Sequence, residues 1–206
     1  MGSGGYVICE YDSVKEDFPE FQSVLDALHV NLLAKAEADW SPLKFDRDHP
    51  MAPRAGYFGE STIIPSLFED RVNVTLVTWE QWYDFVNKGM TIPGNNVIMQ
   101  GANGGNMYED YKVGLAGLVF LDKAIRISEI KMQISDKKLP RINIEEALAY
   151  NKPAIVFEDG YILDEETGFE LQAYATTPGP QSIKLLGFQL NRVKDKLFTN
   201  AGSPLV

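Results

Sequence analysis

The second half of the chain alternates apolar and polar residues in short segments, and this pattern narrows the possible folds more than any other feature. From Ile92 to Arg192 the apolar residues mostly recur at every second position, and Gly, Pro, Asn and Asp interrupt them at short intervals. A period of two places alternate side chains on opposite faces of a β-strand. The pattern predicts a mainly β chain of about eight strands, folded as an antiparallel β-sandwich.

The segments between the turn residues define the expected elements. Strands are expected near 72–78, 96–100, 112–121, 124–135, 154–158, 161–163, 169–176 and 182–192. Apolar residues at helical spacing, with Gly89 as the C-cap, predict a short helix near 79–88. One or two helical turns are expected at 143–150, in the long connection between the sheets.

The strand expected at 124–135 changes its apolar face part-way along. Its apolar side chains form two sets of opposite parity, first Ile125 and Ile127, then Ile130, Met132 and Ile134. A slip of one residue turns every later side chain to the other face of the sheet. We therefore predict a β-bulge at Ser128–Glu129, where the parity changes.

The first part of the chain is different, because its clearest period is helical. Within residues 13–38 an apolar stripe recurs at spacings of three and four residues, formed by Phe18, Phe21, Leu25, Leu28 and Leu32. This spacing predicts an amphipathic helix. We expect the helix to lie on the domain or on a neighbouring subunit.

A proline-rich stretch from Trp40 to Pro65 follows the predicted helix. It holds four prolines and has no sustained period, and it is long for a connector inside a compact domain. It also holds aromatic residues, which disordered linkers usually lack. We therefore expect an extended arm that becomes ordered against another surface. The expected interface residues of the helix and the arm are Phe18, Phe21, Leu25, Trp40, Phe45, Tyr57 and Phe58.

The chain length suits one domain with a substantial extension. We assign residues 1–65 to a leader, the helix and the arm, and residues 66–206 to the sandwich domain with the short helix near 79–88. The start of the chain has no basic segment followed by an apolar one, so we expect a flexible leader rather than a signal peptide. No run approaches eighteen apolar residues, so no transmembrane segment is expected.

The charge and the cysteine content exclude several classes of function. The net charge is −10, from 29 acidic and 19 basic residues. This balance opposes nucleic-acid binding through a broad basic surface, because such binding depends on neutralising phosphates. The single cysteine, Cys9, rules out an intramolecular disulfide and a Cys-based zinc site.

The chain has few residues or motifs of the kinds that enzymes use for catalysis or metal binding. The only histidines are His29 and His49, and neither lies in the β-rich half, so a jelly-roll metal site with several histidines is not expected. The segment Asp46–His49 alternates acids around an arginine, which fits a charged turn before Pro50 better than a metal site. No nucleophile elbow or phosphate loop occurs. We expect no enzyme activity, no cofactor and no metal.

Two loops remain as candidate ligand contacts. The segment 101–106 is rich in Gly and Asn, and the segment 159–168 is rich in acids and ends in Thr-Gly. The first composition is typical of a mobile surface loop, and the second is typical of hairpin turns, in which Gly supplies a positive φ. Calcium or glycan binding is the alternative interpretation of these loops. The candidate ligand residues are Asn103, Asn106, Asp164 and Glu166.

The order of the strands resembles that of jelly-roll structural proteins of viruses and phages, namely capsid, coat or decoration subunits. The residues that carry this resemblance are Ile92-Pro93-Gly94 at the opening of a strand, Gly114 and Gly117 inside an apolar strand, Pro140 and Pro153 in the long connection, and the closing segments 161–163, 169–171 and 181–188. The resemblance implies self-assembly, with copies of this chain and other structural subunits as partners. It also implies no catalysis and no cofactor.

These observations leave three classes of function to distinguish. We expect a non-enzymatic structural subunit, which would place the chain in a virion. The alternative is a carbohydrate- or ligand-binding β-sandwich module that uses the two loops, in which case a cytoplasmic location is expected. A hydrolase that acts through surface carboxylates is the third class, and no constellation of residues supports it.

Overall fold

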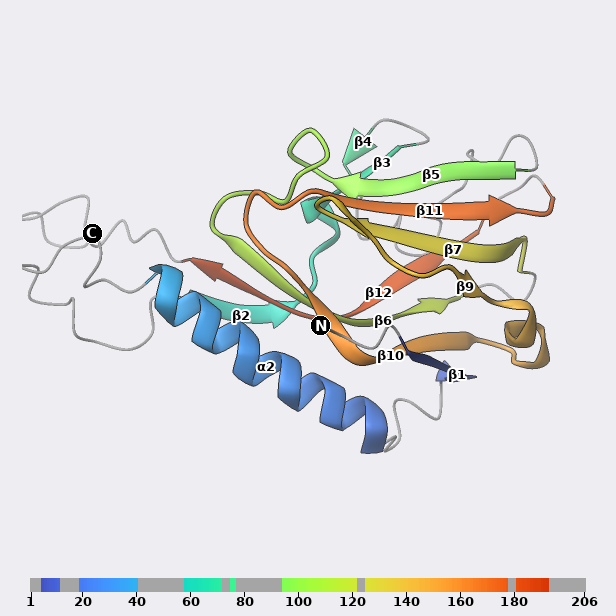
Figure 1. Cartoon of the computed structure of the whole chain (residues 1–206), viewed down its shortest axis with the longest axis horizontal. Helices are drawn as coiled ribbons and strands as arrows, with labels where there is room; N and C mark the ends of the chain where they lie inside the picture. The colour runs from blue at the N-terminus through green and yellow to red at the C-terminus, as the bar shows by residue number, and fades with distance from the viewer. Residues whose placement is uncertain are drawn as a thin grey trace, which may run out of the picture.

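The computed structural model describes residues 5–11, 19–40, 58–71, 75–76, 94–121, 125–177 and 181–192. These residues form two antiparallel sheets that pack face to face, and a long helix lies on the outside of one sheet (Figure 1). The predicted mainly β sandwich with a helix near the N-terminus is confirmed.

The elements follow one another in the order labelled in Figure 1. They are β1 (Tyr6–Glu10), α2 (Pro19–Trp40), β2 (Phe58–Thr62), the 3-10 helix η1 (Pro65–Leu67), β3 (Phe68–Asp70), β4 (Thr75–Leu76), β5 (Gly94–Gly101), β6 (Tyr111–Phe120), β7 (Ile127–Ile134), β8 (Lys137–Lys138), β9 (Ile142–Asn143), the 3-10 helix η3 (Glu145–Ala149), β10 (Pro153–Leu163), β11 (Phe169–Ala175) and β12 (Ile183–Arg192). The helical turn expected at 143–150 is confirmed as η3.

The pairing of the strands is nested. Sheet A has the order β1-β10-β6-β12-β2, and sheet B has the order β4-β3-β5-β11-β7-β8, with β9 also paired to β7. Strand β2 therefore pairs with β12, β5 with β11, β6 with β10, and β7 with β8 and β9. The strands β2, β5, β6 and β7, taken in chain order, alternate between the two sheets.

The predicted bulge in β7 is confirmed. Tyr174 of β11 pairs with Glu129, whereas the next residue, Ala175, pairs with Ile127. Ser128 is therefore the extra residue, and the apolar side chains on both sides of it reach the core. A bulge keeps both sets on one face by adding a single unpaired residue.

The prediction of two strands in the region of β10 is wrong. The sequence predicted two strands, at 154–158 and 161–163, with a turn at Asp159–Gly160. The structure instead has one strand across Pro153–Leu163, whose register against β6 shifts between Val156 and Tyr161. Gly160 has φ +63°, so it forms an irregularity inside the strand and does not reverse the chain.

The segment before residue 66 contributes strands that the sequence did not predict. Strand β1 pairs with β10 at one edge of sheet A, and β2 pairs with β12 at the other edge. The division into 1–65 and 66–206 stays a prediction, but sheet A takes strands from both sides of it.

The main core lies between the two sheets. Its largest fully buried aromatic side chains are Phe68, Phe120, Phe157 and Phe169. The rings of Phe68 and Phe169, from the same sheet, meet edge to face with centroids 5.5 Å apart, a favoured aromatic geometry. Strand β6 is buried on both faces, because sheet B covers one face and α2 covers the other.

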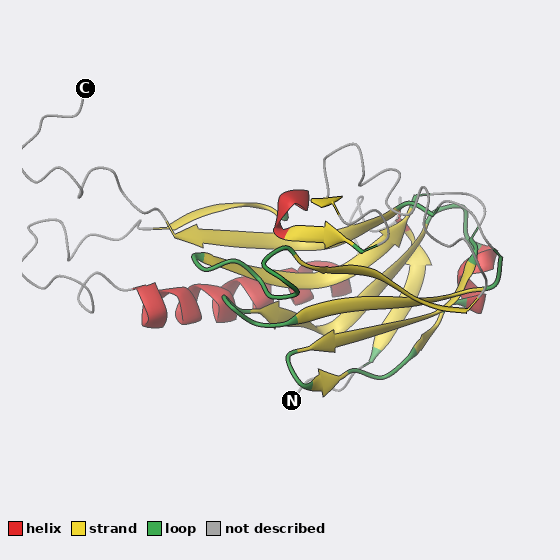
Figure 2. Ribbon diagram, turned by 90° about the horizontal axis from the view of Figure 1, so that it is seen from above, coloured by secondary structure: helices red, strands yellow, loops and turns green. Residues whose placement is uncertain are grey.

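The helix α2 covers the outer face of sheet A (Figures 1 and 2). Its buried side chains recur every four residues, at Val24, Leu28, Leu32, Ala36 and Trp40. The predicted apolar stripe is confirmed in part, since Leu28 and Leu32 are buried and Phe21 and Leu25 only half-buried. A Cβ on Gly160 would stand 2.5 Å from Cδ1 of Leu28, so this glycine lets the helix approach the sheet.

Several predicted features lie outside the described residues, namely the helix near 79–88, Phe18, Phe45, His49, Tyr57 and most of the arm. Among the residues that are described, no helix is both long and apolar enough to cross a membrane.

Candidate functional site

The most distinctive polar feature of the described chain is a buried lysine in β6. Lys112 has no exposed side-chain surface. Its Nζ donates hydrogen bonds to Asp164 and to Oδ2 of Asp39, the latter at 2.8 Å, and it lies 3.5 Å from Oε1 of Glu165. The ammonium also lies 4.9 Å from the ring centroid of Trp40, within the range of a cation–π contact. We call Lys112, Asp39, Asp164, Glu165 and Lys35 the charge cluster.

The charge cluster joins the end of α2 to sheet A and the loop after β10. Nζ of Lys35 lies 2.7 Å from Oδ2 of Asp164. The indole Nε1 of Trp40 donates to the carboxylate of Glu165 at 3.1 and 3.3 Å. The backbone N–H of Asp110 donates to the same carboxylate at 3.2 Å. A buried charge is tolerated only when it is paired in this way.

The pKa directions agree with this geometry. Burial by itself lowers the pKa of Lys112, but the hydrogen bonds to Asp164 and Asp39 outweigh burial and raise the pKa above its ordinary value. Burial by itself raises the pKa of Asp164, but the hydrogen bonds from Lys112 and Lys35 lower it below its ordinary value. Lys112 and Asp164 are therefore held in their charged forms, which suits a structural ion pair and not a proton-transfer catalyst.

The three carboxylates of the cluster have the spacing of a metal site. One oxygen from each of Asp39, Asp164 and Glu165 lies within 4.8 Å of the others. The ammonium of Lys112, however, already contacts all three carboxylates. A metal ion among them would bring a second positive charge against a lysine with no exposed surface. The donor set therefore fits an ammonium better than a cation from solution.

The structure brings together the two loops that the sequence singled out. Asn106 forms a β-bridge with Gly168, and the backbone N–H of Met107 donates to the carbonyl of Thr167 at 2.9 Å. Of the four candidate ligand residues, Asn103, Asn106 and Glu166 are exposed. The carboxylate of Asp164 is different, because it bonds to the two lysines of the charge cluster.

The predicted interface residues that are described have separate environments. Phe21 and Leu25 pack partly against sheet A, and Phe58 begins β2. Trp40 was expected in the arm, but it is the last residue of α2, and only 3% of it is exposed. Its hydrogen bond and its contact with Lys112 are made inside the chain, which leaves little of it for a neighbour.

The one histidine within the described ranges is also engaged. Nε2 of His29 lies 3.0 Å from Oε2 of Glu60, and its ring meets Phe188 edge to face. The side chains of the pair are 41% and 51% exposed, so it is a surface contact between α2 and β2, and such contacts are weak.

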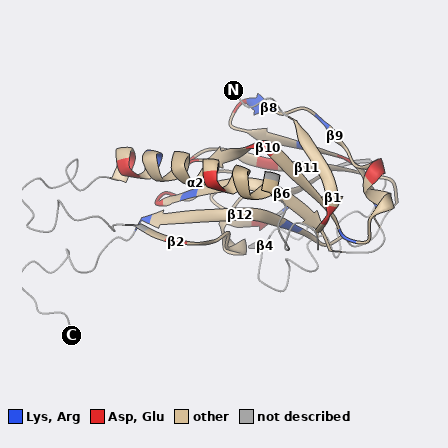
Figure 3. Cartoon of the chain, turned by 90° about the horizontal axis from the view of Figure 1, so that it is seen from below, with Lys and Arg blue, Asp and Glu red and all other residues tan. Residues whose placement is uncertain are grey.

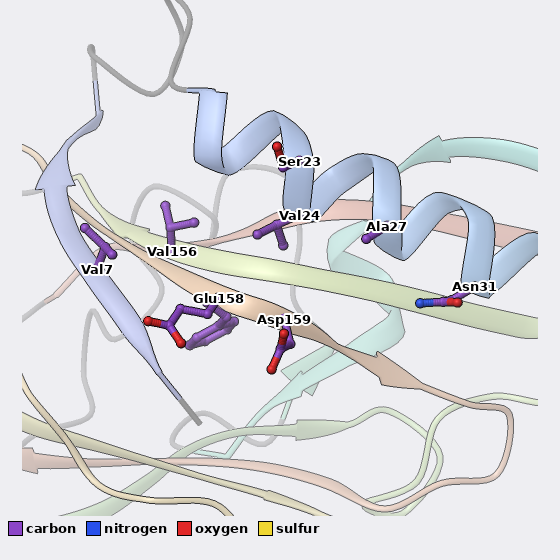
Figure 4. Close-up of a pocket in the computed structure, with 9 residues that line it drawn as sticks. Val7, Ser23, Val24, Ala27, Asn31, Val156, Glu158 and Asp159 are labelled. Carbon is purple, nitrogen blue, oxygen red and sulfur yellow. The ribbon is translucent and has the colours of Figure 1, made fainter. Parts of the chain in front are cut away.

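A groove runs between β1 and α2 on the outer face of sheet A (Figure 4). Its volume is about 510 Å³. Val24 and Ala27 face it from the helix, and Val7 and Val156 face it from the strands. The acidic residues Glu158 and Asp159 lie at its end on β10, and Ser23, Asn31 and Phe157 also line it. The groove is therefore apolar in its centre and acidic at one side.

The outer face of sheet B is polar by contrast. A shallow hollow of about 160 Å³ lies there between Tyr174, Gln172, Lys131, Arg141 and Glu129. Arg141 pairs with Glu129 at 3.1 Å, and Tyr174 is 48% exposed. On the described part of the chain seen in Figure 3, Lys and Arg are scattered among the acidic residues and form no broad basic face.

No protein-family model, no curated protein and no solved structure matches this chain. The geometry therefore carries the functional argument.

Sequence reasoning missed the charge cluster and the edge strand β1. The one available indication of the cluster was Lys112 itself, a charged residue next to an apolar run that ends at Phe120. A lysine in a strand buried on both faces requires a carboxylate partner. For β1 the indication was the apolar sequence from Tyr6 to Cys9, which was too short to be recognised beside the leader.

Proposed function

We propose that this chain is a non-enzymatic structural subunit that self-assembles, as capsid, coat or decoration proteins of viruses and phages do, and that it belongs in a virion. The nested pairing of the strands carries the proposal. Four nested pairs whose strands alternate between two sheets are the arrangement of a jelly roll, a fold used by viral capsid proteins. The same fold also serves lectins and cupins, so the fold alone does not decide the function.

The environment of the polar groups supports a structural role. Lys112 is enclosed by carboxylates, and His29 contacts Glu60 on the surface. These groups join elements that are distant in sequence, namely α2, β2, β6 and the loop after β10. The buried contacts of Lys112 hold α2 against sheet A within the subunit.

Light scattering after size-exclusion chromatography, followed by electron microscopy, tests the proposal on the full chain. We expect particles much larger than a dimer, with a mass that rises with protein concentration. A mass of one or two chains at every concentration would contradict the proposal. Removing residues 1–65 is not a suitable test, because it would delete β1, α2 and β2 from the folded sandwich.

A carbohydrate-binding module is the second candidate, and the hollow at Tyr174 favours it. An exposed aromatic ring beside amide and charged side chains is a common lining for a sugar. Titration of the chain with oligosaccharides, compared with the variant Tyr174→Ala, tests this candidate. Saturable binding that the substitution abolishes would support it, and equal binding by both proteins would exclude this hollow as the site.

A further inference from the structure

Strand β1 is an edge strand of sheet A. Within the described ranges β1 pairs with β10 on one side, and no strand pairs with its other side. Every side chain from Tyr6 to Glu10 keeps some exposure, although Tyr6 and Ile8 pack against the main core. An open strand edge is a template for another strand unless a protein blocks it.

Among the described residues, one end of sheet B carries a feature that discourages strand pairing, and the end of sheet A at β1 lacks that feature. Strand β8 consists of Lys137 and Lys138, both exposed, and lysines on an edge strand discourage pairing. Strand β1 has five residues and includes neither Lys nor Pro.

The hydrogen bonds to β10 establish which backbone groups of β1 face outward. The carbonyl of Gly5 accepts from the N–H of Glu158 at 3.0 Å, and the N–H of Tyr11 donates to the carbonyl of Lys152 at 2.8 Å. Both bonds belong to the single register of the β1–β10 pair. In an antiparallel pair the hydrogen-bonded positions alternate, so the odd-numbered residues of β1 direct their N–H and C=O groups toward β10.

It follows that Tyr6, Ile8 and Glu10 direct their backbone N–H and C=O groups away from β10, toward the open edge. These three residues present the donors and acceptors that an added strand requires. The side chains of Val7 and Cys9 lie on the outer face of sheet A, where Val7 is 41% exposed and lines the groove beside α2.

We propose that β1 pairs antiparallel with β1 of a second copy of this chain, about a twofold axis at Ile8, and so joins the two A sheets into one. This inference rests on the proposed function, because it names the surface and the partner of one assembly contact. A second copy is the fitting partner because the edge is complementary to itself. In this register Ile8 faces Ile8 and Tyr6 faces Glu10, and all three outward positions are hydrogen-bonded.

The same register has a consequence for the outer face. Val7 stands opposite Cys9 of the partner subunit, in a position without hydrogen bonds, where Cα atoms approach to about 4.5 Å. The apolar floor of each groove then continues across the seam into the next copy.

Proline at position 8 tests the backbone contact. Ile8→Pro removes the outward N–H but no hydrogen bond to β10, whereas Ile8→Ala removes similar packing and keeps the N–H. We expect the dimer Kd of Ile8→Pro to exceed that of Ile8→Ala by about tenfold or more, because two symmetric hydrogen bonds are lost. Sedimentation equilibrium gives the two constants, and circular dichroism confirms that both variants are folded.

Cross-linking tests the register independently, and it remains informative if Ile8→Pro does not fold. In Val7→Cys the new thiol would face Cys9 of the partner subunit at a separation suited to a disulfide. Val30→Cys is the matched control, because Val30 is 66% exposed on α2. Burial and the neighbouring Glu10 raise the pKa of Cys9, so an added oxidant is used. We expect disulfide-linked dimers from Val7→Cys, with peptides that join positions 7 and 9.

The outcomes separate this inference from the proposed function. Dimers linked between positions 7 and 9, without larger particles, would support the β1 contact and contradict the capsid-like role. Large particles that form equally well with Ile8→Pro and give no such cross-link would overturn the β1 contact alone. A strict monomer would overturn both.

Discussion

The two sheets of the sandwich share a core but differ on their outer faces. The outer face of sheet A is apolar and is covered by α2, with Leu32 and Ala36 completely buried there. The outer face of sheet B is polar and open, with Glu129, Lys131 and Tyr174 partly or largely exposed. Within the described residues, sheet B therefore has a polar outer face without a covering helix, whereas sheet A is covered by α2 and ends at β1, whose outer side pairs with no described strand.

The charge cluster explains how the added layer is held in place. Apolar packing along α2 buries surface but does not fix where the helix lies along the sheet. At the C-terminal end of α2, Asp39 accepts a hydrogen bond from Lys112, and Trp40 donates one to Glu165. These directional contacts fix the position of the helix. The comparison between the sheets therefore predicts that changes under α2 cost far more stability than similar changes on sheet B.

The largest effect is expected from Leu32→Ala. The Leu32 side chain is fully buried between α2 and sheet A, so its loss leaves a cavity. We expect a decrease of about 3 to 4 kcal/mol in the free energy of unfolding, measured by urea denaturation. The control Tyr174→Ala on sheet B should cost about 0.5 kcal/mol or less. Equal decreases in the free energy of unfolding for the two variants would contradict the difference between the outer faces of sheets A and B.

A somewhat smaller effect is expected from Lys112→Met. The substitution keeps the apolar volume but removes the buried ammonium that contacts all three carboxylates, and it leaves only Lys35 beside Asp39 and Asp164. We expect a loss of about 3 kcal/mol, the low end for breaking a buried ion pair, because the carboxylates are a quarter to a third exposed. Lys131→Met on sheet B is the control, with an expected change within about 0.5 kcal/mol. An unchanged or raised stability of Lys112→Met would show that the cluster does not hold the helix.

Two glycines with nearly equal φ isolate the contact between α2 and sheet A. Gly160 has φ +63° and Leu28 beside it, whereas Gly104 has φ +61° and open space within 4 Å of the point where a Cβ would stand. Alanine at either position meets the same backbone strain of about 1 kcal/mol. We expect Gly160→Ala to cost about 2 kcal/mol more than Gly104→Ala, from overpacking against Leu28. Chemical denaturation of both variants measures the difference. Equal costs would mean that α2 shifts to make room for the added methyl group.

The smallest effect is expected from pH. The pKa of Asp164 is lowered in the folded chain, so its contribution to stability is present above the ordinary carboxyl pKa of about 4 and is lost as the pH falls through the lower folded value. The part of the loss that is due to Asp164 should be smaller than the loss from Lys112→Met, because it removes the charge of one carboxylate and leaves the ammonium in place. Denaturation curves between pH 6 and about pH 2 measure it. If the free energy of unfolding falls with pH as steeply in Lys112→Met as in the unmodified chain, groups other than Asp164 cause the acid sensitivity.

Much of the fold could be predicted from the sequence because burial of one face imposes a period of two. This period located β5, β6, β7, β11 and β12 within a few residues, and it located the bulge at Ser128. It failed for β2, whose residues after Phe58 are Gly, Glu, Ser and Thr, since an edge strand need not alternate. It also divided β10, because Gly160 inside a strand resembles a turn.

The candidate sites were less predictable because they depend on distances between remote segments. The charge cluster joins α2, β6 and the loop after β10, and no local pattern connects Asp39 with Asp164. The outward direction of the Ile8 backbone depends on the register of β1 against β10, which the sequence does not reveal. The segment 101–106 was predicted as a surface loop and 164–168 as a turn, but their contact with each other depends on the order of the strands in the sheets.

Amide hydrogen exchange of the full chain at low and high protein concentration tests the central claim most directly. In the single chain β10 protects the amides of Val7 and Cys9, whereas those of Tyr6, Ile8 and Glu10 point away from β10 and pair with no described strand. We predict that assembly slows exchange at Tyr6, Ile8 and Glu10 and leaves Val7 and Cys9 as they were. Exchange at these three amides that stays fast while light scattering reports assembled protein would contradict the account.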